Sequence, residues 1–295
     1  MPTPFIKKSF HFQKIIGRLL TAFFCIILWQ GCFKFRTSDP KVMQAFEQKG
    51  INLRIHNFYY SKEKKIHYVE SGDSTAPSIY FVHGTPGSWN NFKDYLADSL
   101  LGTQYRMIAI DRPGFGYSNF GKAETMVTQV NAFNRLIKEK DNGQPVVLVG
   151  HSLGGPIIVG MSAKDSGIAH TLLILAGSVS PALEPKEGWR KPLGSPLFSW
   201  IAPGAMRPSN DEMIDFKKYI NTMPEALGSI TAEVYIMHGT KDMFVPFGNV
   251  DYAEKHLTKA KNIYTIKLEG ENHFIPWTRF SSIRDLFLHI RKGLI

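Results

Sequence analysis

The chain has 295 residues, of which 43% are hydrophobic, 20% charged and 13% aromatic. A chain this apolar, with ordinary glycine and proline content, can bury a large core, which excludes a disordered or fibrous protein. The formal net charge of +10 is unevenly spread, because residues 1–31 hold four lysines and arginines and no acidic residue. No basic run with interleaved aromatics follows, so we expect no nucleic-acid partner.

The amino terminus combines a basic lead with an apolar run of 11 residues, Leu19–Trp29. This order is typical of an export signal, and the run is shorter than the ~20 residues of a membrane span. Gly31-Cys32 resembles the cleavage site of bacterial lipoproteins, which implies a lipidated Cys32 and a bacterial cell-envelope location. An uncleaved anchor from about Ile15 to Phe35 and a wholly soluble protein are the alternatives for residues 1–31.

The two cysteines, Cys25 and Cys32, both lie in this segment. The rest of the chain therefore cannot hold a disulfide, an iron–sulfur cluster or a cysteine-ligated zinc ion. We expect a fold that rests on its core alone, with no metal and no cofactor.

Residues 32–50 are predicted to be a polar tether, and residues 51–295 a single α/β domain. Short β-rich runs alternate with amphipathic stretches, which indicates a mostly parallel sheet with helices on both faces. The predicted strands are Lys65–Val69, Ser78–Val82, Arg106–Ile110, Pro145–Val149, Thr171–Ala176, Glu233–Met237 and Asn262–Leu268. The predicted helices are Asn91–Leu101, Thr125–Lys140, Ser152–Ala163, Asn249–Leu257 and Ser282–Lys292.

One interval breaks this alternation, between the strand ending at Ala176 and the strand beginning near Glu233. More than fifty residues lie here, rich in proline and aromatics, where one short helix would suffice. We interpret residues 180–228 as a short helical insertion. It contains a predicted helix, Asn210–Met223, with Asp211 and Glu212 in its first turn and its end before Pro224.

The segment Gly150-His151-Ser152-Leu153-Gly154 follows a buried strand and opens a predicted helix. A serine on such a sharp turn needs small neighbours, because the backbone is strained and passes close to other segments. Gly150 and Gly154 supply that room, and Ser152 is the candidate nucleophile. The alternative is a serine that only caps the helix.

A serine hydroxyl needs a base to take its proton and an acid to orient that base. Asp242 and His273 each follow a late strand, so they can meet Ser152 at the carboxyl edge of the sheet. Asp251 and Glu271 are rival acids, but neither lies as directly behind a strand.

From about Ile51 to its end the chain resembles the α/β-hydrolase family, with its nucleophile, acid and histidine in this order and a variable lid at the position of the insertion. The resemblance assigns these roles to Ser152, Asp242 and His273. His83-Gly-Thr-Pro-Gly87 resembles the family's oxyanion loop, which implies backbone N–H donors at Thr85 and Leu153. We expect His83 and Gly84 to support this loop. His151, His238 and Asp111 are expected to make local contacts, Asp111 by holding backbone groups.

The serine at position 152 argues against the dehalogenase and soluble epoxide-hydrolase branches of this family, which use aspartate there. We therefore expect hydrolysis of a small hydrophobic ester, lactone or thioester, the acyl substrate being the only expected small-molecule partner. Apolar residues of the insertion either line the pocket or form lid core; they are Phe198, Trp200, Ile201 and Met213. A non-hydrolytic binding or signalling protein and a cofactor-free perhydrolase are the alternatives. The proline-specific aminopeptidase branch is disfavoured, because its lid is larger.

Overall fold

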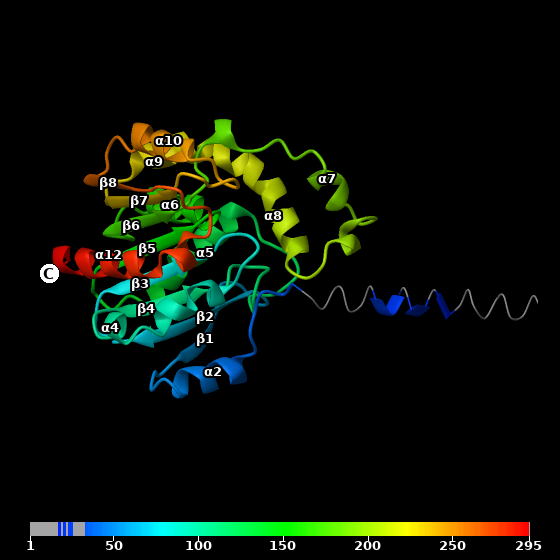
Figure 1. Ribbon diagram of the computed structural model, residues 1–295, viewed down its shortest axis with the longest axis horizontal. Coiled ribbons are helices and arrows are strands. Elements are labelled where there is room, and N and C mark those ends of the chain that lie inside the picture. Colours follow the sequence, from blue (N-terminus) through cyan, green and yellow to red (C-terminus); the bar gives the residue numbers. More distant parts are fainter. Residues whose placement is uncertain (1–16, 19, 22, 26–32, 295) are drawn as a thin grey trace, which may run out of the picture.

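The computed structural model describes residues 17–18, 20–21, 23–25 and 33–294 of the chain. Eight strands form one sheet in the order β1-β2-β4-β3-β5-β6-β7-β8 (Figure 1). β2 is antiparallel to both its neighbours, and the strands from β4 to β8 run parallel. The strands are β1 (Arg54–Tyr59), β2 (Lys65–Gly72), β3 (Ser78–Val82), β4 (Arg106–Ile110), β5 (Val146–His151), β6 (Thr171–Leu175), β7 (Glu233–Gly239) and β8 (Asn262–Leu268).

The central strands explain why the sequence pattern was clear. Every residue of β3, β4, β5 and β6 is buried, as expected for parallel strands covered on both faces. β1 was missed in the sequence because it is an edge strand in which Phe58 alone is buried, so its apolar signal is weak.

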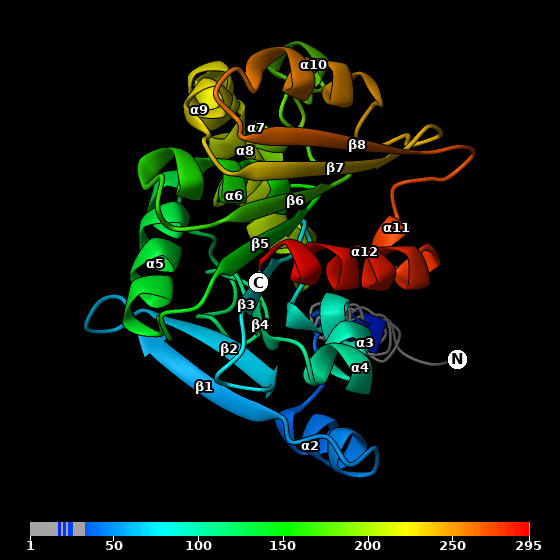
Figure 2. The same cartoon turned by 90° about the vertical axis from the view of Figure 1, so that its left-hand side faces the viewer.

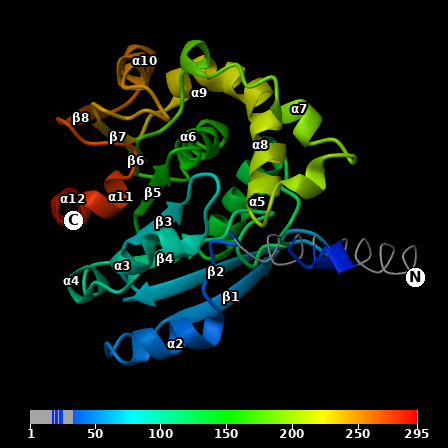
Figure 3. The same ribbon diagram turned by 45° about the vertical axis from the view of Figure 1, so that its right-hand side comes forward.

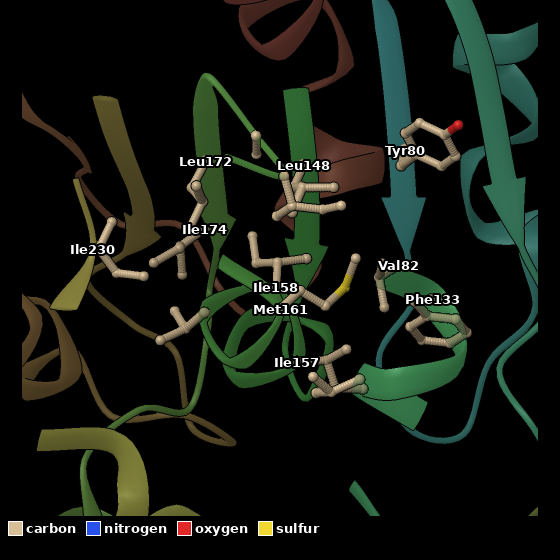
Figure 4. Packing of buried hydrophobic residues seen from close by; sticks show 14 of the residues in the cluster. Tyr80, Val82, Phe133, Leu148, Ile157, Ile158, Met161, Leu172, Ile174 and Ile230 are labelled. Atoms are coloured by element: carbon tan, nitrogen blue, oxygen red, sulfur yellow. The ribbon is translucent and has the colours of Figure 1, made fainter. Parts of the chain in front are cut away.

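Helices cover both faces of the sheet (Figures 2 and 3). One hydrophobic cluster joins the sheet to the face of α5, α6 and α9, and a second joins it to α2, α3 and α12. Figure 4 shows Ile157, Ile158 and Met161 of α6 packed near Leu148 and Ile174 of the sheet. Outside the insertion, the helical elements are α2 (Asp39–Glu47), η1 (Trp89–Phe92), α3 (Lys93–Leu96), α4 (Ser99–Gly102), α5 (Met126–Glu139), α6 (Gly154–Lys164), α10 (Gly248–His256), α11 (Ile275–Thr278) and α12 (Phe280–Gly293).

The expected tether at residues 32–50 differs from the structure, because α2 folds within it. Val42 and Phe46, four residues apart on one helix face, are buried in the second cluster. Phe46 makes an edge-on contact with Trp89, with the ring centroids 6.5 Å apart. The apolar positions were too few to reveal this helix in the sequence, yet they extend the folded body upstream of residue 51.

The interval between β6 and β7 contains the expected helical insertion, made of η2 (Pro181–Leu183), α7 (Arg190–Leu193), η3 (Ser199–Ile201), α8 (Met206–Tyr219), η4 (Ile220–Thr222) and α9 (Met223–Ser229). The predicted helix 210–223 was wrong at both ends. α8 starts at Met206, so Asp211 and Glu212 lie beyond its first turn. Pro224 lies in the first turn of α9, where proline is tolerated because its missing N–H has no helical partner there.

The amino-terminal predictions, including lipidation at Cys32, fall largely outside the described residues. Among the described residues, no helix has the length and apolar character that a membrane crossing requires.

Candidate active site

Three of the sequence-predicted site residues follow parallel strands of the sheet. Ser152 follows β5, Asp242 lies three residues beyond β7, and His273 follows β8. Because β5 to β8 are consecutive parallel neighbours, the loops after them emerge at one edge of the sheet. Ligands of open α/β sheets bind at this carboxyl edge.

Ser152 has a left-handed backbone, with φ of +54°. Its N–H donates to the carbonyl of Leu175 at 2.9 Å, which ties the turn to the end of β6. A Cβ added to Gly150 would lie 2.3 Å from the carbonyl oxygen of Gly154, and one added to Gly154 would lie 2.2 Å from the carbonyl oxygen of Val82. The glycines expected to support the turn are thus required by close backbone contacts. Ser152 does not cap α6, whose N-cap is Leu153.

The side chains of Asp242 and His273 are in direct contact, with Nδ1 of His273 2.7 Å from a carboxylate oxygen of Asp242. The other carboxylate oxygen accepts the backbone N–H groups of Phe244 and Val245 at 2.9 and 2.8 Å. Burial alone would raise the pKa of Asp242, but hydrogen bonds from His238, His273 and Val245 outweigh it and hold this pKa well below its usual range. The carboxylate is therefore ionised and orients the imidazole of His273.

The rival acids have other surroundings. Asp251 is exposed in the first turn of α10. Glu271 forms an ion pair with Arg279 at 2.5 Å and accepts a hydrogen bond from Thr278 at 3.0 Å. Asp242 is therefore the acid that contacts His273.

The loop after β3 lies against the turn at Ser152. A Cβ on Gly84 would come within 2.8 Å of the Cβ of Ser152, so a larger residue cannot stand there without displacing the serine. Within the described part of the chain, the backbone N–H groups of Thr85 and Leu153 donate no hydrogen bond. Two unused N–H groups beside a serine can donate hydrogen bonds to a developing oxyanion.

His83 is fully buried and holds this loop. The backbone N–H of Arg112 donates to its Nε2 at 3.0 Å, so Nδ1 carries the proton and donates to the carbonyl of Gly84 at 2.7 Å. Burial and the nearby Arg112 charge hold the pKa of His83 well below its usual value, so the ring is neutral. These contacts match the support role expected for His83.

Asp111 holds backbone, as the sequence predicted. Its carboxylate accepts the N–H groups of Trp89 and Tyr117, each at 2.8 Å, and also contacts Nδ1 of His67. A Cβ on Gly116 would overlap this carboxylate, so the glycine is required by the close approach.

His151 and His238 also make local contacts. Nε2 of His151 lies 3.0 Å from the carbonyl oxygen of His273, and Nε2 of His238 lies 2.9 Å from that of Val245. Burial, with a smaller contribution from His273, lowers the pKa of His151 to about 3. His151 is therefore neutral and links the turn at Ser152 to the loop that carries His273.

The predicted pocket residues of the insertion are exposed or partly buried. Phe198, Trp200 and Ile201 are 44%, 51% and 47% exposed, and Met213 packs partly buried against the first hydrophobic cluster. A cavity of about 620 Å³ lies near the amino ends of β5 and β6, away from Ser152.

Sequence reasoning missed an aromatic group beside His273. Phe244, 65% exposed, has its ring centroid 5.4 Å from that of His273, and Phe274 lies next to both. Trp277 meets the ring of His151 edge-on at 5.4 Å. In the sequence, what could have pointed to these three rings is their position within four residues of Asp242 or His273. Among the described residues, no cluster of His, Cys, Asp and Glu side chains is suited to a metal ion.

Comparison with known proteins agrees with this architecture. Residues 77–201 match the family model of the alpha/beta hydrolase fold, a range that includes Ser152 but neither Asp242 nor His273. The chain is 25% identical over 124 residues to "Epoxide hydrolase 1" of Caenorhabditis elegans, which covers 41% of this chain and 28% of that relative. The chain thus spans less than a third of the length of this relative.

Two solved structures share the fold. A putative lipase from Acinetobacter baumannii superposes with a TM-score of 0.68 at 16% identity, covering 87% of this chain and 97% of that one. A putative aryl esterase from Burkholderia cenocepacia gives a TM-score of 0.66 at 18% identity, covering 81% and 100%.

Gly154→Ala tests the steric requirement of the turn. Alanine is normally favoured over glycine in a helix by roughly 0.5–1 kcal/mol. Here the added methyl group would lie 2.2 Å from the carbonyl oxygen of Val82, so we expect the free energy of unfolding to fall by about 3 kcal/mol in urea titrations followed by circular dichroism. Gly188→Ala, where no atom lies within 4 Å of the added carbon, is the control and should change stability by less than about 0.5 kcal/mol. Equal stabilities would contradict the steric account.

The lowered pKa of His151 predicts a pH dependence of stability. The unfolded chain takes up a proton at this ring near the usual histidine pKa of 6.5, whereas in the folded chain the pKa is about 3. The unfolded state therefore binds more protons between these values, and stability falls as the pH drops. We expect urea titrations from pH 7.5 to 4 to show a shallower loss for His151→Gln than for the wild type. Parallel curves would refute the assignment.

Proposed function

We propose, from the premise that the chain has the α/β-hydrolase fold, that it is a serine hydrolase acting on a small hydrophobic carboxylic ester, lactone or thioester. The observation that carries the proposal is the buried, ionised Asp242 bonded to His273 at 2.7 Å, at the sheet edge where Ser152 occupies a left-handed turn. An orienting acid, a base and a serine hydroxyl are the three parts of a nucleophilic relay.

In the proposed reaction, Nε2 of His273 accepts the proton of the Ser152 hydroxyl as its oxygen attacks the acyl carbonyl. The N–H groups of Thr85 and Leu153 stabilise the resulting oxyanion, each such donor being worth about 3 kcal/mol of activation free energy. The imidazolium then protonates the leaving alcohol or thiol, and the acyl-enzyme forms. Water, deprotonated by His273, releases the acid and regenerates the serine.

Two features favour an uncharged acyl substrate. Phe244 and Phe274 place exposed aromatic rings beside His273, and exposed apolar side chains of the insertion include Leu197 and Phe198. Apolar and aromatic side chains are the usual lining of sites that bind hydrophobic ligands.

The alternatives differ in what they require. Epoxide hydrolysis, the activity in the name of one relative, uses an aspartate nucleophile in the soluble epoxide-hydrolase branch of the family, whereas position 152 of this chain is serine. A binding protein with an idle site would keep the fold without turnover. A cofactor-free perhydrolase would use the same three residues, and peroxide-dependent halogenation with acetate would reveal it.

Ser152→Ala tests the proposal. We expect the wild type to hydrolyse p-nitrophenyl butyrate and the variant to lose at least ~1,000-fold in kcat, because the nucleophile is removed while the oxyanion donors remain. A fluorophosphonate probe should label the wild type at Ser152, as located by peptide mass spectrometry, and should leave the variant unlabelled. Absence of both turnover and labelling in the wild type would favour the binding protein.

We also propose that residues 1–31 form an export signal and that Cys32 carries a lipid anchor in the bacterial cell envelope. The basic lead, the apolar run and the Gly-Cys pair support this assignment. Intact mass of the protein extracted from membranes should correspond to a chain that starts at a lipidated Cys32, and Cys32→Ser should abolish the added mass. A chain that starts at an unmodified Met1 would refute it.

A further inference from the structure

A fully buried ion pair joins the insertion to the loop that follows β4. Arg112 lies two residues beyond β4, and Glu212 lies on α8, 100 residues later in the chain. Both side chains have 0% exposure, and the guanidinium donates to the two carboxylate oxygens at 2.7 and 2.8 Å. This bidentate geometry is the strongest form of an arginine–carboxylate contact.

Stability alone is a weak reason for such a pair. Burying two charges costs several kcal/mol per ion, and well-packed apolar residues in their place are often neutral or stabilising. The packing of α8 already has an apolar component, since Phe216 of α8 and Ile220, which directly follows the helix, are buried. The other contacts of Arg112 therefore indicate what the charge does.

The guanidinium of Arg112 also contacts the oxyanion loop. Its Nη2 donates to the carbonyl oxygen of Gly84 at 2.9 Å, and this same oxygen accepts Nδ1–H of His83 at 2.7 Å. The backbone N–H of Arg112 also donates to Nε2 of His83, so both donors on Gly84 are fixed by the same residue.

The carbonyl of Gly84 and the N–H of Thr85 belong to one peptide unit. That unit is planar, and its C=O and N–H point in opposite directions. Two donors that hold the oxygen therefore also fix the direction of the Thr85 N–H. A cation on the oxygen polarises the amide further, because hydrogen bonds in a chain strengthen one another in a low dielectric.

From these contacts we propose that Arg112, held by Glu212 of the insertion, is a positioning residue for the Thr85 N–H, so that the insertion completes the oxyanion site. The proposal rests on the proposed function, in which this N–H stabilises the oxyanion formed from the ester. Arg112 and Glu212 touch no reacting atom. They act through the peptide between Gly84 and Thr85.

The decisive variant is the double change Arg112→Met with Glu212→Met. It removes both charges together, so the fold should persist with a thermal midpoint near that of the wild type. Without the hydrogen bond from Arg112 to Gly84, we expect kcat for p-nitrophenyl butyrate to fall about 10- to 100-fold, while KM stays within about twofold. This loss of kcat is smaller than the loss expected when an oxyanion donor is removed altogether. Affinity for a trifluoromethyl ketone, whose adduct with Ser152 carries an oxyanion, should fall in parallel with kcat.

Asp215→Asn provides a matched control on the same helix. Asp215 accepts the backbone N–H of Met126 at 2.8 Å and so attaches α8 to α5 without contacting Arg112 or Gly84. This variant should change the thermal midpoint alone, with kcat and ketone affinity as in the wild type. Glu212→Gln keeps the shape of the side chain but removes the counter-charge, so its thermal midpoint should fall. Assayed at a temperature where circular dichroism shows it folded, it gives a second reading if the double variant does not fold, and should lower kcat by about 10-fold.

The outcomes separate the two proposals. If the folded double variant or Glu212→Gln keeps wild-type kcat, or loses kcat with unchanged ketone affinity, the pair is only a structural attachment and the inference falls while the hydrolase proposal stands. If the wild type itself neither hydrolyses esters nor reacts with the fluorophosphonate, both fall.

Discussion

The structure depends on one steric constraint, the close approach of neighbouring backbone segments at the turn that carries Ser152. The chain turns there from β5 into α6 with a left-handed residue, a conformation that costs of order 1–3 kcal/mol for a side chain other than glycine. The turn persists because α6 is buried along most of its length and because the Ser152 N–H is bonded to β6. Gly84, Gly150 and Gly154 admit the close approaches that result. The position of the hydroxyl thus follows from packing that extends well beyond it.

Of the buried titratable side chains around this turn, some are neutral and others are charged. Burial lowers the pKa of His83 and of His151, so these rings are neutral hydrogen-bonding groups between loops. Asp242 is the opposite case, because donated hydrogen bonds outweigh its burial and keep it ionised. Two imidazoles contact this carboxylate, that of His273 at 2.7 Å and that of His238 at 3.4 Å. The fold therefore places His83 and His151 between loops, and His238 and His273 against the acid.

Much of the fold could be predicted from the sequence where the signal was strong and local. β3, β4 and β8 have the predicted bounds. β3 and β4 are buried throughout and give continuous apolar runs, whereas β8 is a largely exposed edge strand that is rich in β-branched and aromatic residues. β1 and α2 could not be predicted, since each buries too few residues to create a pattern. The break at Pro224 was misplaced because proline ends one helix and begins the next with equal ease.

The candidate site divides in the same way. Ser152, Asp242 and His273 could be singled out because each directly follows a strand-like run. The exposed rings of Phe244 and Trp277 were not singled out, since only their nearness in sequence to Asp242 and His273 marks them. The contact of Arg112 with Glu212 was beyond reach for a different reason. Residues 100 apart meet only through the packing of α8, and no local pattern encodes that meeting.

The same buried pair restricts how related chains can diverge. Exposed residues of the insertion, such as Trp189 and Leu197, lie outside this pair and can change without leaving a buried charge unpaired. Loss of the acidic group at Glu212 alone would leave the guanidinium of Arg112 buried without a counter-charge, which typically costs about 3–5 kcal/mol. Substitutions at these two positions are therefore expected to be inherited together. In related chains the rest of the insertion can vary, while the arginine and the carboxylate are expected either both to be kept or both to be replaced.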